Sequence, residues 1–315
     1  MFKSPIWAWG RWFLLGFLAL RVIFWIFTFP NPDEAYYWLW GQHPGFSYYD
    51  HPPFQAWGQG LMVGGLGRSN LVLRLPNAIS SAVLGLTFYH ICRYLYGAAA
   101  IDRFWLVVLL GASSPLFFLF LALAWNDHWL VTFTVVSSFW FVRFVDGYGA
   151  TGKGDPWYLY GAAVALGLAG LCKYNAVFVG LGFLALVLSQ GRLRSLLRHP
   201  PFYLALGLLL LVLSPILVWN LHHDFYSFQF YGERTAGSGR LSLSPLQPLV
   251  FLLLCGLILG PIQAWSLIRW LRQRPWRRHP ISPSGQASFY PILALWIFGL
   301  SSAAFTALSL VSVAI

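Results

Sequence analysis

The chain has 315 residues, of which 58% are hydrophobic and only 9% are charged. Soluble globular domains carry roughly 25% charged residues, so this composition excludes an ordinary soluble enzyme with a polar surface. The net charge of +11 does not indicate a nucleic-acid partner, because the basic residues are scattered between apolar stretches and form no single basic face.

Apolar stretches of suitable length to cross a bilayer as helices recur along nearly the whole chain. We therefore predict an all-α, polytopic transmembrane helical bundle that forms one domain over residues 1–315 and is surrounded by membrane lipids. The nine predicted spans cover residues 12–29, 71–91, 104–123, 129–145, 157–171, 175–190, 202–219, 247–268 and 289–311.

The basic residues between these spans predict the orientation of the chain. Cytoplasmic loops of membrane proteins are enriched in Lys and Arg, and most of the 20 basic residues share one side when the N-terminus is cytoplasmic. Six of the nine acids then lie on the opposite, outer side: Asp33, Glu34, Asp50, Asp127, Asp224 and Glu233.

The first outer segment, residues 30–70, is unusually polar for this chain. Its aromatic residues 33–42 predict a short interfacial helix, which Pro44 ends. Residues 54–66 predict a second interfacial helix, and the turn-rich sequence GFSYYDHPP separates the two.

Three outer acids are candidate catalytic residues. Asp33, followed by Glu34, opens the first interfacial helix, where acidic side chains also favour a helix start. Asp50 lies in a proline-fixed loop and Asp127 in a short turn, where Asp is also common for backbone reasons. Because acids at a membrane boundary are costly unless they face water, a partner or a substrate, we interpret the three as one site.

Lys173 and Tyr174 interrupt the otherwise apolar sequence from Leu159 to Ser189. A lysine at a helix end can simply extend its ammonium into the headgroup region. Lys173 lies on the acid-rich side, against the usual preference of basic residues, so we expect it to bind an anion such as phosphate.

The last outer loop, residues 220–246, follows Trp219 with the polar and aromatic sequence NLHHDFYSFQFYGER. Arg234 is a second candidate phosphate contact, because a guanidinium matches phosphate bidentately. His223 directly follows another histidine, and adjacent histidines do not easily bind one metal ion together. A divalent metal at His222, His223 and Asp224 stays an open alternative, and no other cofactor is predicted.

Taken in order, these motifs resemble bacterial family 39 membrane glycosyltransferases. That family is related to the protein O-mannosyltransferases and the lipid A aminoarabinose transferases, and has the GT-C fold. The resemblance spans residues 33–234 and rests on DEAYYWLW at 33–40, YYDHPP at 48–53, RLP at 74–76, the Asp127 turn, LCKYNAV at 171–177 and WNLHHDFYSF at 219–228.

The resemblance implies transfer of a sugar, with inversion, from a polyprenyl-phosphate donor to a hydroxyl of a lipid, glycan or protein acceptor. The reaction would occur at the outer face of the bacterial inner membrane. The family's catalytic base corresponds to Asp33. Where aminoarabinose transferases have a phosphate-binding lysine before the prolines, this chain has His51. The other candidate donor-phosphate or substrate contacts are Glu34, Tyr49, Lys173, Tyr174, Asn220, His223 and Arg234. The resemblance to the aminoarabinose transferases also implies a divalent metal at Asp50 and His223, whereas the resemblance to the protein mannosyltransferases implies none, so a metal stays an open alternative.

Two other function classes stay open. A lipid-linked sugar flippase or transporter would line a path across the bilayer with polar groups, whereas the predicted spans carry almost no charge apart from Arg21. A non-catalytic membrane assembly subunit is the second alternative. Family members usually run longer, so we expect that their C-terminal part is missing here, in a fragment or a naturally short form.

Overall fold

The computed structural model describes residues 5–115, 117, 122–236, 246–274 and 288–311. These residues form helices and no strand, which confirms the predicted all-α class. The helices are α1 (Pro5–Phe27), α2 (Pro32–Gln42), α3 (Phe54–Leu66), α4 (Asn70–Tyr96), α5 (Ala100–Ala112), α7 (Asn126–Thr151), α8 (Pro156–Cys172), α9 (Val177–Ser189), α10 (Pro200–His222), α11 (Tyr226–Ala236), α12 (Leu246–Leu259), α13 (Pro261–Arg272) and α14 (Tyr290–Val311), with short 3₁₀ turns at Gly97–Ala99, Tyr174–Ala176 and Gly191–Arg198.

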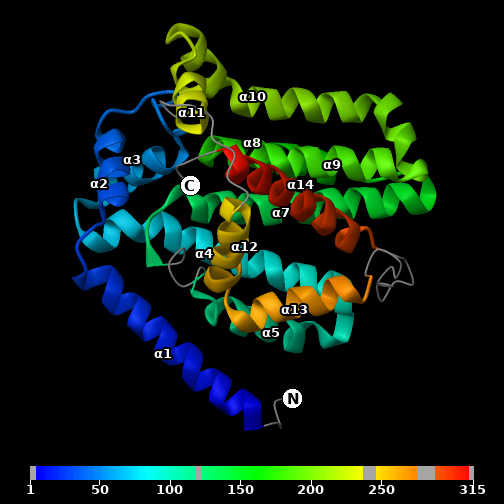
Figure 1. Ribbon diagram of the computed structural model, residues 1–315, viewed down its shortest axis with the longest axis horizontal. Helices are drawn as coiled ribbons and strands as arrows, with labels where there is room; N and C mark the ends of the chain where they lie inside the picture. Colours follow the sequence, from blue (N-terminus) through cyan, green and yellow to red (C-terminus); the bar gives the residue numbers. More distant parts are fainter. Residues whose placement is uncertain (1–4, 116, 118–121, 237–245, 275–287, 312–315) are drawn as a thin grey trace.

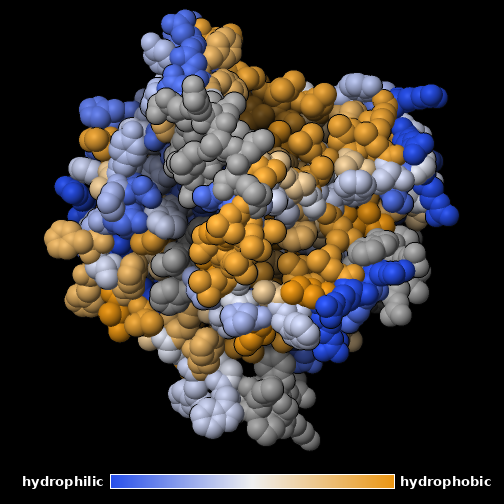
Figure 2. All heavy atoms as spheres, in the orientation of Figure 1, coloured by the Kyte–Doolittle hydropathy of each residue, from blue (hydrophilic) through white to orange (hydrophobic). Residues whose placement is uncertain are grey.

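The long helices α4, α7, α8, α9, α10 and α14 run side by side, and α2, α3 and α11 gather at one end of this bundle (Figure 1). Apolar side chains cover much of the middle of the face shown in Figure 2, over α12 and the helices beside it. Polar side chains lie toward the two ends of the bundle on this face. This distribution fits a bundle whose middle lies in hydrocarbon.

The expected number of nine spans is not confirmed. Within the described residues, four helical segments are long and apolar enough to cross a membrane, and up to seven segments qualify when each bent pair of helices counts as one span. The predicted span 247–268 is broken at Gly260, where φ is 97°, and α12 and α13 meet there at 110°. Glycine reaches this backbone region at no steric cost, and helical periodicity alone does not reveal such a break.

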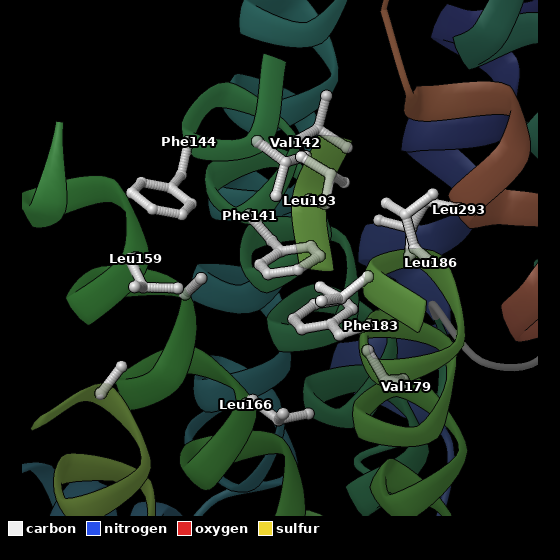
Figure 3. Packing of buried hydrophobic residues seen from close by; sticks show 14 of the residues in the cluster. Phe141, Val142, Phe144, Leu159, Leu166, Val179, Phe183, Leu186, Leu193 and Leu293 are labelled. Atoms are coloured by element: carbon white, nitrogen blue, oxygen red, sulfur yellow. The ribbon is translucent and has the colours of Figure 1, made fainter. Parts of the chain in front are cut away.

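The best-packed core lies between α7, α8, α9 and α14 (Figure 3). Phe141 and Phe183 stack with ring centroids 4.1 Å apart, while Leu186 is completely buried. Gly161 lets α8 approach α7 so closely that an added Cβ would meet the Trp140 ring at van der Waals overlap. Within a bilayer, such packing is stabilised by close van der Waals contact more than by removal from water.

Helices α2 and α3 match the two predicted interfacial helices. The side chain of Asn31 accepts a hydrogen bond from Glu34 N at 2.8 Å, and the Glu34 carboxylate accepts one from Asn31 N at 3.0 Å, which forms a capping box at the start of α2. The two helices cross at Gly41 and Gly60, where a Cβ on Gly41 would lie 2.8 Å from the backbone oxygen of Ala56. No larger residue fits between the two backbones.

Candidate functional site

Two adjacent acids at the start of α2 have different environments. Asp33 is exposed, and its carboxylate has no hydrogen bond or ion pair within the described part of the chain. Glu34 is completely buried and accepts hydrogen bonds from Arg74 Nε and Nη2, both at 2.8 Å, and from Ala124 N at 2.7 Å. Asp33 is therefore free to meet a substrate, whereas Glu34 lies outside the exposed site.

The partner of Glu34 ties three helices together. Arg74 on α4 is 1% exposed, and its Nη1 donates to the backbone oxygens of Phe24 and Trp25 and, at 2.9 Å, to the Thr28 hydroxyl. These acceptors lie at the end of α1, whose last carbonyls have no partner within their own helix. A buried ion pair is tolerated only when its remaining donors and acceptors are satisfied, as they are here.

Residues 122–125, just before α7, are held by side chains from other helices, and residues 123–125 are not helical. Gln55 on α3 and Asn77 on α4 supply most of the donors, and each is 1% exposed. Irregular backbone within membrane proteins needs such internal partners. The bonds are Trp25 Nε1 to Ala122 O at 2.9 Å, Asn77 Nδ2 to Leu123 O at 3.3 Å and Trp125 O at 2.9 Å, and Gln55 Nε2 to Ala124 O at 2.9 Å. We call Glu34, Gln55, Arg74, Asn77 and residues 122–125 the frame.

Lys173 and Asp127 form an ion pair beside the frame. The Lys173 ammonium lies 2.8 Å from Asp127 Oδ1, and the two side chains are 28% and 23% exposed. The preceding residue, Asn126, is buried and donates from Nδ2 to Cys172 O at 3.1 Å, which fixes the start of α7 against the end of α8. Because an ammonium has three donors, Lys173 keeps donors for an anion besides Asp127.

Asp50 and His51 face the same end of the bundle from the loop between α2 and α3. Asp50 Oδ2 lies 3.3 Å from His51 Nδ1, and both side chains are about one fifth exposed (19% and 21%). The second oxygen, Asp50 Oδ1, is buried and has no hydrogen-bond partner in the described part of the chain. This loop is rigid, because Tyr48 stacks on Trp40 at 4.3 Å and its hydroxyl donates to Trp40 O at 2.9 Å.

Tyr37 lies among the three predicted catalytic acids, although the sequence did not single it out. Its ring is buried edge-on against His51 at 5.7 Å. Burial raises the pKa of its hydroxyl well above the usual range, and the Asp33, Asp127 and Asp50 carboxylates raise it further. Tyr37 therefore stays a neutral hydrogen-bond donor. The i, i+4 spacing from Asp33, which places both on one face of α2, is the signal in the sequence that could have found it.

Helix α11 covers the side of the site opposite the frame. Tyr49 packs against Phe230 at 5.0 Å, and Tyr174 stacks on Phe228 at 6.1 Å. The Tyr174 hydroxyl is buried without a hydrogen-bond partner in the described part of the chain. Tyr49 and Tyr174, both predicted site residues, therefore lie where the first outer loop and the Lys173 turn meet α11.

Two predicted contacts, Asn220 and His223, have their hydrogen-bond partners within their own helix. Asn220 is 1% exposed, because α10 continues through His222 and the Asn220 amide donates to Ile216 O of its own helix at 3.0 Å. His223 is exposed, stacks on Trp219 at 4.2 Å and donates from Nδ1 to Trp219 O at 2.8 Å. The Arg234 side chain and residues 237–245 of the predicted outer loop lie outside the described residues.

The predicted metal site is not assembled by the described residues. No three His, Cys, Asp or Glu side chains among them come close enough to hold a metal ion. Asp50 has His51 beside it, and the Nδ1 of His223 is engaged by its own helix. The residues present therefore do not fit a metal centre at Asp50 and His223.

An apolar cavity of about 600 Å³ begins next to the Lys173 turn. Tyr174 and Phe228 line it at this end, and Val187 and Phe202 line it near the opposite ends of α9 and α10. It therefore runs along the helices, with almost entirely apolar walls, and most of its remaining lining comes from α8, α9 and α10: Leu159, Ala162, Ala163, Leu166, Gly170, Leu181, Phe183, Leu184, Ala205, Leu206, Leu209, Leu213 and Ile216.

Two solved structures share this architecture. Crystal structures of ArnT from Cupriavidus metallidurans, in the apo state and bound to undecaprenyl phosphate, superpose with TM-scores of 0.68 and 0.67 at 17% sequence identity. They align with 99% and 97% of this chain, which spans only 57% of the ArnT chain. This similarity shows the fold and confirms the GT-C architecture expected from the sequence.

Sequence comparison identifies the family. No curated protein matches the chain, but the family described as dolichyl-phosphate-mannose-protein mannosyltransferase matches residues 50–219. The match begins at Asp50 and extends through Asp127 and Lys173. It therefore includes two of the three predicted catalytic acids, while Asp33 precedes it. Because the match covers more than half of the sequence, the chain belongs to the dolichyl-phosphate-mannose-protein mannosyltransferase family.

Proposed function

We propose that the protein is a membrane glycosyltransferase that moves a sugar from a polyprenyl-phosphate donor to an acceptor hydroxyl, with inversion. The observation that carries this proposal is the Lys173 ammonium, 28% exposed, beside an apolar cavity that runs along the helices. An apolar channel next to a cation suits an amphiphile with a long hydrocarbon chain and one anionic group. A polyprenyl phosphate has this chemistry.

The donor would bind with its chain in the cavity and its phosphate at Lys173. Tyr174 lines the cavity and follows Lys173 directly, so its unpartnered hydroxyl lies where chain and phosphate join. As the bond between the anomeric carbon and the phosphate oxygen breaks, its electron pair leaves with the phosphate. The Lys173 ammonium, oriented by Asp127 at 2.8 Å, stabilises that developing charge.

Asp33 is the proposed general base. Its exposed carboxylate makes no hydrogen bond in the described part of the chain, so it can take the proton of the acceptor hydroxyl as that oxygen attacks the anomeric carbon. The new carbon–oxygen bond forms on the face opposite the departing phosphate, which inverts the anomeric configuration. Asp50, with one buried unpaired oxygen, would accept a hydrogen bond from a sugar hydroxyl.

His51 and Arg234 are proposed supporting contacts to the donor. His51 stands where relatives have a lysine, next to Asp50, and would donate a hydrogen bond to the phosphate. Arg234 lies in α11, which borders the cavity through Phe228. The mechanism contains no metal-dependent step, because Asp50 and His223 do not form a metal centre with other described residues.

We further infer that the site faces the outer side of the bacterial inner membrane and that the N-terminus is cytoplasmic. This orientation follows the distribution of basic residues in the sequence. The Asp33, Asp50 and Asp127 carboxylates all raise the pKa of Tyr37 on α2, which lies with α3 at one end of the bundle. The basic 3₁₀ turn Gly191–Arg198 is separated from Lys173 by the whole of α9.

The test is a transfer assay with purified protein in lipid, labelled polyprenyl-phosphate sugars and candidate acceptors, with products identified by mass spectrometry. Asp33→Asn should lower transfer by roughly 10²–10⁴-fold, the range of general-base catalysis, while the protein stays folded. Asp102→Asn is the matched control, because Asp102 is also an exposed acid in the first turn of a helix. Full activity of Asp33→Asn would remove Asp33 from the mechanism.

The same preparation separates the alternative functions. A flippase would move the lipid-linked sugar across the bilayer without forming a new glycosidic bond. A non-catalytic assembly subunit would do neither, whichever donor is supplied. A new glycosidic bond that depends on Asp33 is the outcome expected here.

A further inference from the structure

Helix α11 makes two hydrogen bonds to the backbone of the Asp50 loop. The Tyr231 hydroxyl donates to Asp50 O at 2.6 Å, and the Ser227 hydroxyl donates to Tyr48 O at 3.2 Å. Ser227 and Tyr231 are four residues apart, so they share one face of the helix. Both bonds join segments about 180 residues apart in sequence.

Tyr231 also touches the turn that carries Lys173. Its ring lies edge-on to Tyr174 at 5.5 Å, and Tyr174 stacks at the same time on Phe228 of α11. Tyr174 directly follows Lys173, whose ammonium binds Asp127. One side chain thus contacts the Asp50 loop through its hydroxyl and the Lys173 turn through its ring.

We propose that Tyr231 is a positioning residue that sets the spacing between the Asp50 carboxylate and the Lys173 ammonium. This inference rests on the proposed function, in which Asp50 holds the sugar and Lys173 the phosphate of one donor. Tyr231 acts through the backbone of the Asp50 loop and through the ring of Tyr174, the neighbour of Lys173. In the frame, by contrast, the described contacts hold residues 123–125, which lead into α7 and Asp127.

The chemical reason for such a residue is that transfer is sensitive to small displacements. A shift of about 1 Å between reacting groups can lower a rate by roughly 10²-fold. The Asp50 loop is irregular and is followed by Pro52 and Pro53. Its internal hydrogen bonds are centred on Tyr48, whereas the Asp50 carbonyl accepts its hydrogen bond from the Tyr231 hydroxyl.

The test compares Tyr231→Phe and Ser227→Ala with Tyr226→Phe. Tyr226→Phe also removes a hydroxyl from α11, but the Tyr226 hydroxyl makes no hydrogen bond in the described part of the chain. Hydrogen exchange of peptides over residues 44–57 should speed up by roughly 3–10-fold in Tyr231→Phe, the range of one lost hydrogen bond. Ser227→Ala should show a smaller increase and Tyr226→Phe none.

Kinetic constants distinguish a positioning role of Tyr231 from a purely structural role. In Tyr231→Phe, kcat should fall by about 10-fold while KM for the donor changes by less than about 2-fold, because the contacts that bind the phosphate are retained. Tyr231→Leu removes the ring as well and should add faster exchange at residues 173–176. Unchanged kcat in Tyr231→Phe, with or without faster exchange, would overturn the proposal.

The experiments can disprove the proposed function and the role of Tyr231 independently of each other. If the unmodified protein transfers no sugar, the proposed function fails. Hydrogen exchange then still decides the role of Tyr231, since unchanged exchange in Tyr231→Phe overturns it. If the protein is active and Tyr231→Phe matches Tyr226→Phe in both readouts, only the role of Tyr231 is wrong.

Discussion

The two sides of the site differ in how they are held. On the frame side, Glu34 and Arg74 are completely or almost completely buried, and their polar atoms are engaged by three helices and the backbone of residue 124. On the side of Lys173 and α11, the Lys173 and Asp127 side chains are partly exposed, and the described contacts include one ion pair, two hydrogen bonds and several aromatic rings.

This difference separates residues that stabilise the fold from residues that can act on a substrate. A buried polar group stabilises the fold only when all its hydrogen-bond partners are present. Such a group cannot also exchange these partners for a ligand. Asp33 and Glu34 show the contrast within two consecutive residues. We therefore expect changes in the frame to alter stability and changes at Lys173 or Tyr37 to alter transfer.

The largest effect on stability is expected for Glu34→Gln. This change leaves the Arg74 charge buried without its carboxylate, which typically destabilises a protein by about 3–5 kcal/mol. The measurement is the midpoint of thermal unfolding in detergent. Asp33→Asn is the same kind of change one residue earlier, and it should lower the unfolding free energy by no more than a surface substitution does, about 0.5 kcal/mol. Equal losses of stability in the two variants would contradict the assignment of Glu34 to the fold and of Asp33 to catalysis.

Lys173→Met should give the largest effect on transfer after Asp33. Loss of a charge that stabilises the departing phosphate lowers kcat by roughly 10²-fold or more. Steady-state transfer rates measure this change, and the exposed Lys153 after α7 provides the control Lys153→Met. If both variants retain full activity, Lys173 does not hold the phosphate.

Asn126→Ala tests the contact between the frame side and the Lys173 turn. It removes the donor to Cys172 O and leaves a buried carbonyl unsatisfied, at an expected cost of about 1–3 kcal/mol in unfolding free energy. Unfolding midpoints measure the loss. Asn175→Ala, at an exposed residue, should have no effect, and a stable Asn126→Ala protein would show that this hydrogen bond is dispensable.

Tyr37→Phe is expected to have the smallest effect. It removes one neutral donor from among three carboxylates, so kcat should fall by roughly 3–10-fold without a change in the unfolding midpoint. Tyr36→Phe, at the exposed neighbour, should transfer sugar normally. A loss of stability without a loss of rate would assign Tyr37 to the structural side of the site.

Local sequence signals were sufficient for the helices around the site. Pro32 and Pro44 bracket α2, and Pro53 and Gly67 flank α3, so proline and glycine chemistry alone predicted these boundaries. The gathering of Asp33, Asp50 and Asp127 followed from assigning their segments to one side of the membrane, and their shared effect on Tyr37 agrees with it.

The features of the site that the sequence did not reveal depend on contacts between residues that are far apart in the sequence. Glu34 differs from Asp33 only because residues 74 and 124 lie on its side of α2, and no local pattern encodes that. Arg74 was part of a recognised motif without an assigned role. Asn220 was expected in a loop, but α10 extends three residues beyond the predicted span and takes the side chain into the helix.

The contacts of Glu34 also set an order of events during synthesis. The carboxylate at the start of α2 completes its hydrogen bonds only when Arg74 and the backbone at Ala124 have arrived, and domains made on the ribosome acquire structure as their segments emerge. The hydrogen bonds from Arg74 to the backbone oxygens of Phe24 and Trp25 in α1 also form only when α4 has been made. The helix that carries Asp33 therefore reaches its final position only after 124 residues have been inserted, and early products of translation hold the first acid of the site without its working geometry.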